Sequence, residues 1–184
     1  GLSGTGPKAG GPNYLPRFAA PLPAGGVGNW DESEPTKTLS ARLARAGAGG
    51  GGAADPLDLP GPTGESNRLS VAPRGPVLCL GPGAEAAIAQ ARAIRDLGGI
   101  AVEAGGMIEP DALSLLDPRA GVIWWGDAET GRELAAVLAR RDGPLVPLIT
   151  AMPDLAHACH ERHVCIDTTA AGGNAALLAA VAEG

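Results

Sequence analysis

The stretch that decides the fold is GPVLCLGPGAEAAIAQARAIRDLGG, residues 75–99. Residues 76–80 are an apolar run bounded by glycine and proline, which is typical of a short, fully buried strand. Residues 84–97 carry apolar side chains at helical spacing, and Gly98 and Gly99 end the helix because glycine enters the left-handed region without steric cost. A strand that leads into a helix is the first half of a βαβ unit, so we expect a parallel sheet.

The rest of the chain repeats this alternation. We expect further strands over residues 68–72, 100–104, 121–125, 144–150 and 164–167, and helices over residues 110–116, 129–141 and 154–162. Asp127 has the side chain that an N-cap requires, at the start of the helix over 129–141. The predicted fold class is therefore α/β, a doubly wound and mostly parallel sheet with right-handed crossovers.

The composition excludes several classes of function. Glycine and proline make up a quarter of the 184 residues, so part of the chain is not expected to pack. The net charge of −6 argues against nucleic acid as a partner. No apolar run is long enough to cross a bilayer, and three cysteines at irregular spacing fit free thiols in a reducing cytoplasm. Because the chain lacks an initiator methionine, we expect a fragment of a longer protein.

The first 60 residues differ from the rest. Residues 1–12 contain five glycines and two prolines, which favour a loop with exposed backbone amides. Residues 21–60 are rich in glycine and proline, and only residues 38–46 have a short helical pattern. We therefore expect a flexible, disordered linker over 21–60, since such a segment buries too little apolar surface to offset its ordering entropy.

Three stretches carry a resemblance to a known family. They are LSGTGPKAGGPNYLPRF (residues 2–18), LPGPTGESN (59–67) running into PRGPVLCLGPG (73–83), and DTTAAGGNAALL (167–178). Together they resemble the C-terminal region of proline utilization A, the bacterial family of bifunctional proline catabolic enzymes. The resemblance implies a parent with an FAD-dependent proline dehydrogenase and an NAD-dependent L-glutamate γ-semialdehyde dehydrogenase, which together convert proline to glutamate.

The resemblance also divides the chain. Residues 1–20 would end the upstream aldehyde dehydrogenase domain, 21–60 would be the linker, and 61–184 would be a Rossmann-like domain ending in a C-terminal motif over 163–178. It implies that the 61–184 domain has no active site and acts as a lid that supports the dehydrogenase and closes the substrate-channelling cavity. Its partner would be the upstream domain or another protomer, in the cytoplasm or at the inner membrane surface.

Site residues follow from the same resemblance. The backbone amides of Gly10 and Gly11 would bind the carboxylate of the aldehyde substrate, and Phe18 would pack on its aliphatic part; all three need the upstream domain. The docking motif would be the run of small residues Thr168, Thr169, Ala170, Ala171, Gly172, Gly173 and Asn174. Small residues suit this role because they allow two backbones to approach closely.

Two other sites remain open from the residues alone. Gly81 and Gly83 fit the G-x-G-x-x-A fingerprint of an independent dinucleotide-binding module, with Glu103 about twenty residues on as the ribose-binding acid, although Pro82 removes an N–H from the loop. The second is a zinc site among His157, Cys159, His160, His163 and Cys165. The alternative interpretation of these residues is a polar helix end followed by a buried cysteine in a strand. Within the 184 residues we expect neither a cofactor nor a metal.

Overall fold

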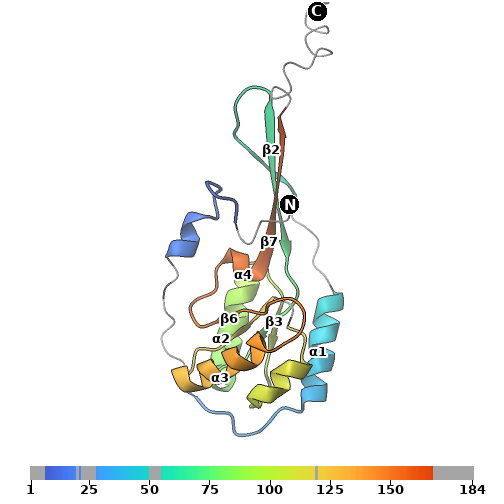
Figure 1. Cartoon of the computed structure of the whole chain (residues 1–184), viewed down its shortest axis with the longest axis vertical. Helices are drawn as coiled ribbons and strands as arrows, with labels where there is room; N and C mark the ends of the chain where they lie inside the picture. Colours follow the sequence, from blue (N-terminus) through green and yellow to red (C-terminus); the bar gives the residue numbers. More distant parts are fainter. Residues whose placement is uncertain (1–6, 20, 22–27, 50–54, 119, 168–184) are drawn as a thin grey trace, which may run out of the picture.

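The computed structural model describes residues 7–19, 21, 28–49, 55–118 and 120–167, which form a mixed α/β protein with two sheets (Figure 1). In chain order the elements are η1 (Leu15–Phe18), α1 (Thr36–Ala48), β1 (Leu57–Leu59), β2 (Glu65–Pro73), β3 (Val77–Cys79), α2 (Gly83–Asp96), β4 (Ala101–Glu103), η2 (Pro110–Leu115), β5 (Gly121–Ile123), α3 (Ala128–Ala139), β6 (Leu148–Ile149), α4 (Leu155–Ala158) and β7 (Cys159–Asp167), where η marks a 3₁₀ helix. Within this part of the chain, no helix is both long enough and apolar enough to cross a bilayer.

The body of the protein is a four-stranded parallel sheet in the order β4-β3-β5-β6. The stretch over residues 75–99 provides its central strand, β3, and the helix α2 that follows, as the sequence predicts. The predicted N-cap is confirmed as well, because the Asp127 side chain accepts a hydrogen bond from the backbone N–H of Thr130 at 2.8 Å.

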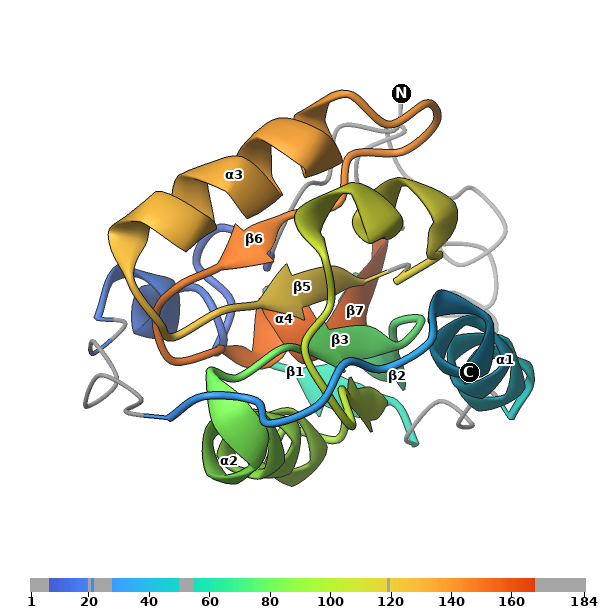
Figure 2. The ribbon, with the colours of Figure 1, turned by 90° about the horizontal axis from the view of Figure 1, so that it is seen from below.

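Helices cover both faces of this sheet (Figure 2). Side chains alternate along β3, so Leu78 and Leu80 face one layer and Val77 and Cys79 face the other. The first layer contains α1, η2 and α3, and the second contains α2 and α4. Strands buried on both sides are typical of parallel sheets, which explains the continuous apolar run that marks β3 in the sequence.

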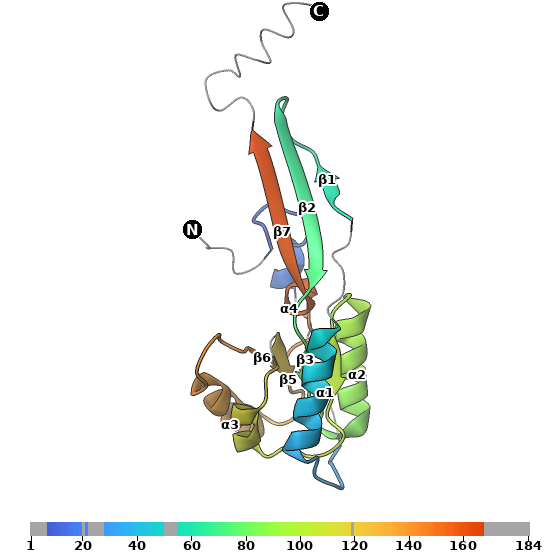
Figure 3. The same ribbon diagram turned by 90° about the vertical axis from the view of Figure 1, so that its right-hand side faces the viewer.

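The second sheet is a three-stranded antiparallel ribbon in the order β1-β2-β7. Its strands β2 and β7 pair over nine residues, from Glu65 opposite Asp167 to Pro73 opposite Cys159. Figures 1 and 3 show the ribbon extending away from the body. The whole parallel sheet therefore lies in the sequence between two strands that pair with each other.

The structure corrects three expectations, two of them through this ribbon. The strand predicted over 164–167 belongs to the ribbon, not to the parallel sheet, and starts already at Cys159. The helix predicted over 154–162 ends at Ala158, because the residues after it pair with β2. The strand predicted over 144–150 contains only two paired residues, Leu148 and Ile149, since prolines 144 and 147 have no N–H to donate.

The predicted linker over 21–60 is also ordered in its described middle part. Residues 36–48 form α1, and its leucines Leu39 and Leu43 are 0% and 2% exposed against the sheet. Trp30 donates a hydrogen bond from its indole Nε1 to the carbonyl of Leu80 at 3.0 Å. The helical pattern predicted over residues 38–46 is therefore confirmed, and the prediction of a flexible linker is wrong for this part, because Leu39 and Leu43, one helical turn apart, bury enough apolar surface to hold the helix on the sheet.

Candidate functional site

The glycine-rich turn between β3 and α2 lies where a dinucleotide fingerprint would place it. Gly81 and Gly83 have φ angles of +100° and +71°, which favour glycine. The buried side chain of Gln90 holds the turn from within α2: its Oε1 accepts a bond from the Gly81 N–H at 3.0 Å, and its Nε2 donates to the Gly81 carbonyl at 2.6 Å. The Gly81 amide is thus bonded inside the protein and does not point to a ligand.

Residues 28–34, which we call the strap, cover this turn. A Cβ on Gly83 would lie 3.2 Å from the Asn29 carbonyl oxygen and 3.3 Å from the Asn29 nitrogen, so the strap backbone packs directly on the turn. Farther along the strap, the Glu34 carboxylate accepts a hydrogen bond from the Gly105 N–H at 2.6 Å and forms an ion pair with the Arg42 guanidinium at 2.8 Å. The strap therefore occupies the space beside Gly83 that a pyrophosphate would need.

Glu103, the candidate ribose ligand, binds a side chain of the protein itself. Its Oε1 lies 2.7 Å from Nη1 of Arg95 on α2. The hydrogen bond from Arg95 is the main reason why the pKa of Glu103 lies below its usual value. The carboxylate is ionised and already paired, so the geometry offers no free acid for a ribose hydroxyl.

A cavity of about 860 Å³ remains at the carboxyl ends of β3 and β5, between the strap, η2 and α3. The indoles of Trp30 and Trp124 and the carboxylates of Glu109, Asp127 and Glu133 line it, and no lysine or arginine of the described residues does. Hydrogen bonds from Thr130 lower the pKa of Asp127, so this carboxylate is charged at neutral pH. Negative charge at the cavity opposes a phosphate group.

The second candidate region is the segment over residues 7–19, which the sequence links to substrate anchoring. Gly10 has φ +77° and an open surface, with no atom within 4 Å of the position of a Cβ. Gly11 donates its N–H to the Lys8 carbonyl at 2.9 Å, which closes a turn. Phe18 is 74% exposed and contacts Tyr14 edge-on, with ring centroids 5.3 Å apart. Gly10 and Phe18 thus face outward.

This segment is attached to β7 and α4; two of its hydrogen bonds join residues 153 and 148 positions apart in the sequence. The carboxylate of Glu161 on β7 accepts hydrogen bonds from the Lys8 N–H at 2.8 Å and from the Asn13 amide at 3.0 Å. Arg17 forms an ion pair with Asp154, the N-cap of α4, at 3.6 Å. Sequence reasoning missed Glu161 and Asp154, because no local pattern indicates a partner so far along the chain.

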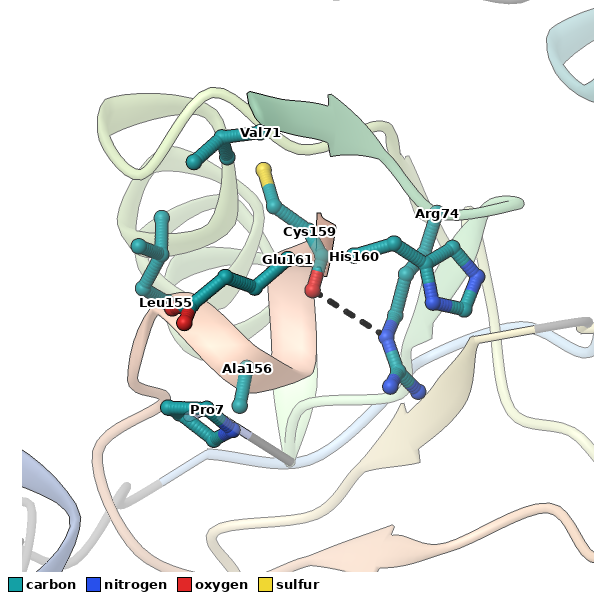
Figure 4. Close-up of a pocket in the computed structure, with 8 residues that line it drawn as sticks. All are labelled: Pro7, Val71, Arg74, Leu155, Ala156, Cys159, His160 and Glu161. Atoms are coloured by element: carbon teal, nitrogen blue, oxygen red, sulfur yellow. Dashed lines mark hydrogen bonds between the residues drawn. The ribbon is translucent and has the colours of Figure 1, made fainter. Parts of the chain in front are cut away.

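A small cavity separates the segment from the base of the ribbon (Figure 4). Pro7 lies on one side of it, and Val71, Leu155 and Glu161 line the other. Its volume is about 30 Å³, the space of one water molecule. This junction therefore holds two parts of the chain together and cannot accept a substrate.

The histidines and cysteines near the C-terminus do not converge. Among the described residues no group of three His, Cys, Asp or Glu side chains is close enough to hold a metal ion. The alternation of β7 separates neighbouring side chains, and His157 accepts a hydrogen bond from the Asp154 N–H at 3.1 Å in the capping box of α4. Cys165, which the sequence places in a buried strand, is exposed on the ribbon.

We predict that the three thiols react at different rates. Burial raises the pKa of Cys79 to about 12, so at pH 8 it remains a protonated, inaccessible thiol. Cys159 is buried as well, whereas Cys165 is exposed. Iodoacetamide followed by mass spectrometry should modify Cys165 in the folded chain, and Cys79 only after urea is added. Equal labelling of Cys79 and Cys165 without denaturant would contradict the packing of β3.

The predicted docking motif, Thr168–Asn174, lies outside the described residues. Its assignment stays a prediction.

Comparison with known proteins finds one class of relatives, long bifunctional proteins of which this chain spans less than a fifth. They are bifunctional PutA proteins. The one from Rhizobium meliloti is 32% identical over 219 residues, which cover 97% of this chain and 18% of the relative. The one from Salmonella typhimurium is 29% identical over 233 residues, covering 97% of this chain and 17% of the relative. These similarities confirm the resemblance to proline utilization A.

Other comparisons add less. No protein-family model matches the chain. A crystal structure of a bifunctional proline utilization A (PutA) protein is 25% identical with a TM-score of 0.39, covering 61% of this chain and 14% of that one. A Bradyrhizobium japonicum proline utilization A mutant is 26% identical with a TM-score of 0.39, covering 51% and 13%.

Proposed function

We propose that this chain is the C-terminal part of a proline utilization A enzyme, and that its residues 61–184, with the strap and α1 packed on them, form a Rossmann-like domain without an active site. In this proposal the domain supports the L-glutamate γ-semialdehyde dehydrogenase and closes the cavity through which the intermediate passes. The parent enzyme would use FAD to oxidise proline and NAD to oxidise the semialdehyde, with both cofactors bound upstream of this chain, in the cytoplasm or at the inner membrane surface.

The observation that carries the proposal is the contact of residues 8–13 with Glu161 on β7. By resemblance, residues 1–20 belong to the dehydrogenase domain, where Gly10, Gly11 and Phe18 would bind the aldehyde. Gly10 and Phe18 face outward, whereas the Gly11 N–H is bonded to the Lys8 carbonyl. Residues 8–17 bind β7 and α4 through hydrogen bonds and an ion pair, so the C-terminal domain would directly contact the substrate-binding loop of the dehydrogenase. The small residues of Thr168–Asn174 would extend the contact.

The absence of catalysis in this domain is supported by the covered turn. The strap packs on Gly83, the Gly81 amide is bonded to Gln90, and Glu103 is paired with Arg95. Two groups that a dinucleotide would use, the Gly81 amide and the Glu103 carboxylate, thus have partners within the chain, and the strap backbone packs on the third position, Gly83. The strand order β4-β3-β5-β6, which is 2-1-3-4 when the strands of this sheet are counted along the chain, and the helices on both faces support a doubly wound α/β domain, Rossmann-like in that broad sense.

The test is truncation of the full-length enzyme after Pro60. We expect the kcat/KM of the semialdehyde dehydrogenase to fall by about tenfold or more, and NADH formation from proline to show a lag that the intact enzyme lacks. The activity of the proline dehydrogenase serves as the internal control, because it should not change. Unchanged dehydrogenase kinetics without a lag would overturn the proposal.

A second measurement addresses the independent dinucleotide-binding module. The 184-residue chain is titrated with NAD and with FAD while its tryptophan fluorescence is followed, since Trp30 and Trp124 lie beside the covered turn. We expect no saturable change below millimolar ligand. Saturation at lower concentration would favour the independent module.

A further inference from the structure

One carboxylate fixes both ends of the turn over residues 8–13. Oε1 of Glu161 accepts a bond from the Lys8 N–H at 2.8 Å, and Oε2 accepts one from the Asn13 side-chain amide at 3.0 Å. Next to it on the same face of β7, Nε2 of His163 lies 3.2 Å from Nζ of Lys8. Hydrogen bonds to an ionised acceptor are stronger than those between neutral groups.

The residues between these two ends rely on glycine for their conformation. Gly11 donates to the Lys8 carbonyl at 2.9 Å, and a Cβ on Gly11 would lie 3.0 Å from that oxygen. Gly10 has φ +77° and faces open space. Because such a turn has many alternative conformations, contacts at its ends determine how often the observed one is populated.

We propose that Glu161 is a positioning residue for substrate binding by the dehydrogenase, acting through this turn without touching the substrate. The inference rests on the proposed function, in which this glycine turn binds the substrate carboxylate; the Gly11 N–H is bonded to the Lys8 carbonyl, so the outward-facing Gly10 is the part of the turn that would meet the substrate. With Glu161 in place, the turn is ordered before the substrate arrives. Without Glu161, substrate binding must also order the turn, and the free energy of this ordering is subtracted from the affinity for the substrate. The chemical step at the aldehyde does not involve the turn, so KM changes and kcat does not.

The experiment uses full-length enzyme carrying Glu161→Ala, with two aldehydes compared. One is L-glutamate γ-semialdehyde, and the other is propanal, which has no carboxylate. We expect KM for the semialdehyde to rise about tenfold while kcat stays within about twofold, and the kinetics with propanal to be unchanged. Glu161→Gln, which keeps one acceptor and turns the other into a donor, should give an intermediate KM.

Glu85→Ala is the matched control, since Glu85 is an exposed glutamate in the first turn of α2 and none of the described hydrogen bonds joins it to residues 7–19. It should leave the kinetics with both aldehydes unchanged. Equal losses with both aldehydes for Glu161→Ala, or no change with either, would overturn the positioning role. Failure of the proposed function has a different signature, namely a truncation after Pro60 that leaves the kinetics intact.

Discussion

Replacing Gly81 by alanine should lower the free energy of unfolding by about 3 kcal/mol or more. The φ of Gly81 is +100°, and a Cβ there would lie 2.6 Å from the nitrogen and 2.8 Å from the oxygen of Gly83. The backbone must therefore shift, and the shift disturbs the two hydrogen bonds to Gln90 and the bond from the Trp125 N–H, which is 3.0 Å long. Urea denaturation of the 184-residue chain measures the loss.

Gly143→Ala provides the control. Gly143 has a similar φ, +93°, but no atom lies within 4 Å of the position of its Cβ. This variant should lose only the backbone strain, about 1 kcal/mol. The difference between the two variants isolates the close packing of the glycine-rich turn. Equal losses would mean that the turn is more open than described.

Leu39→Ala should cost about 3 kcal/mol of stability, within the range for a leucine removed from a packed core. Leu39 is 0% exposed and contacts the first layer of the core from α1. The effect reports on whether the segment predicted as a linker is part of the folded body. Thermal or urea unfolding followed by far-UV circular dichroism gives the value.

Leu145→Ala removes the same atoms from an exposed site, since Leu145 is 89% exposed. It should change the stability by no more than about 0.5 kcal/mol. If Leu39→Ala were as mild as Leu145→Ala, α1 would not be packed on the sheet and the prediction of a flexible linker would be right for this segment.

The sequence predicted the elements whose causes are local. The apolar run of β3, the helical spacing of α2 and the N-cap at Asp127 each arise from a few neighbouring residues, and the structure has them. The parallel sheet followed from their alternation. The apolar run over residues 144–150 predicts a longer strand than β6, because the two prolines within the run limit the pairing to Leu148 and Ile149.

The features that the sequence did not predict depend on distant pairing. Residues 159–162 have a polar composition that is compatible with a helix. They form a strand because they belong to the nine residues of β7 that pair with β2. The strap has no periodicity, and its place is set by contacts with Leu80, Gly83 and Gly105. The role of Glu161 has the same origin, since its two donors lie near the other end of the chain.

The pairing of Pro73 with Cys159 has a consequence for the chain as a whole. The segment between these two positions leaves and rejoins the ribbon at adjacent residues, which is the arrangement of a domain inserted into a hairpin. A short turn joining them would remove the parallel sheet in one piece, but α1, which precedes the ribbon, would lose the core against which Leu39 and Leu43 pack. The ribbon, with the contacts of Glu161 to residues 8–13, is therefore continuous without the sheet, whereas α1 ties the N-terminal part of the chain to the body.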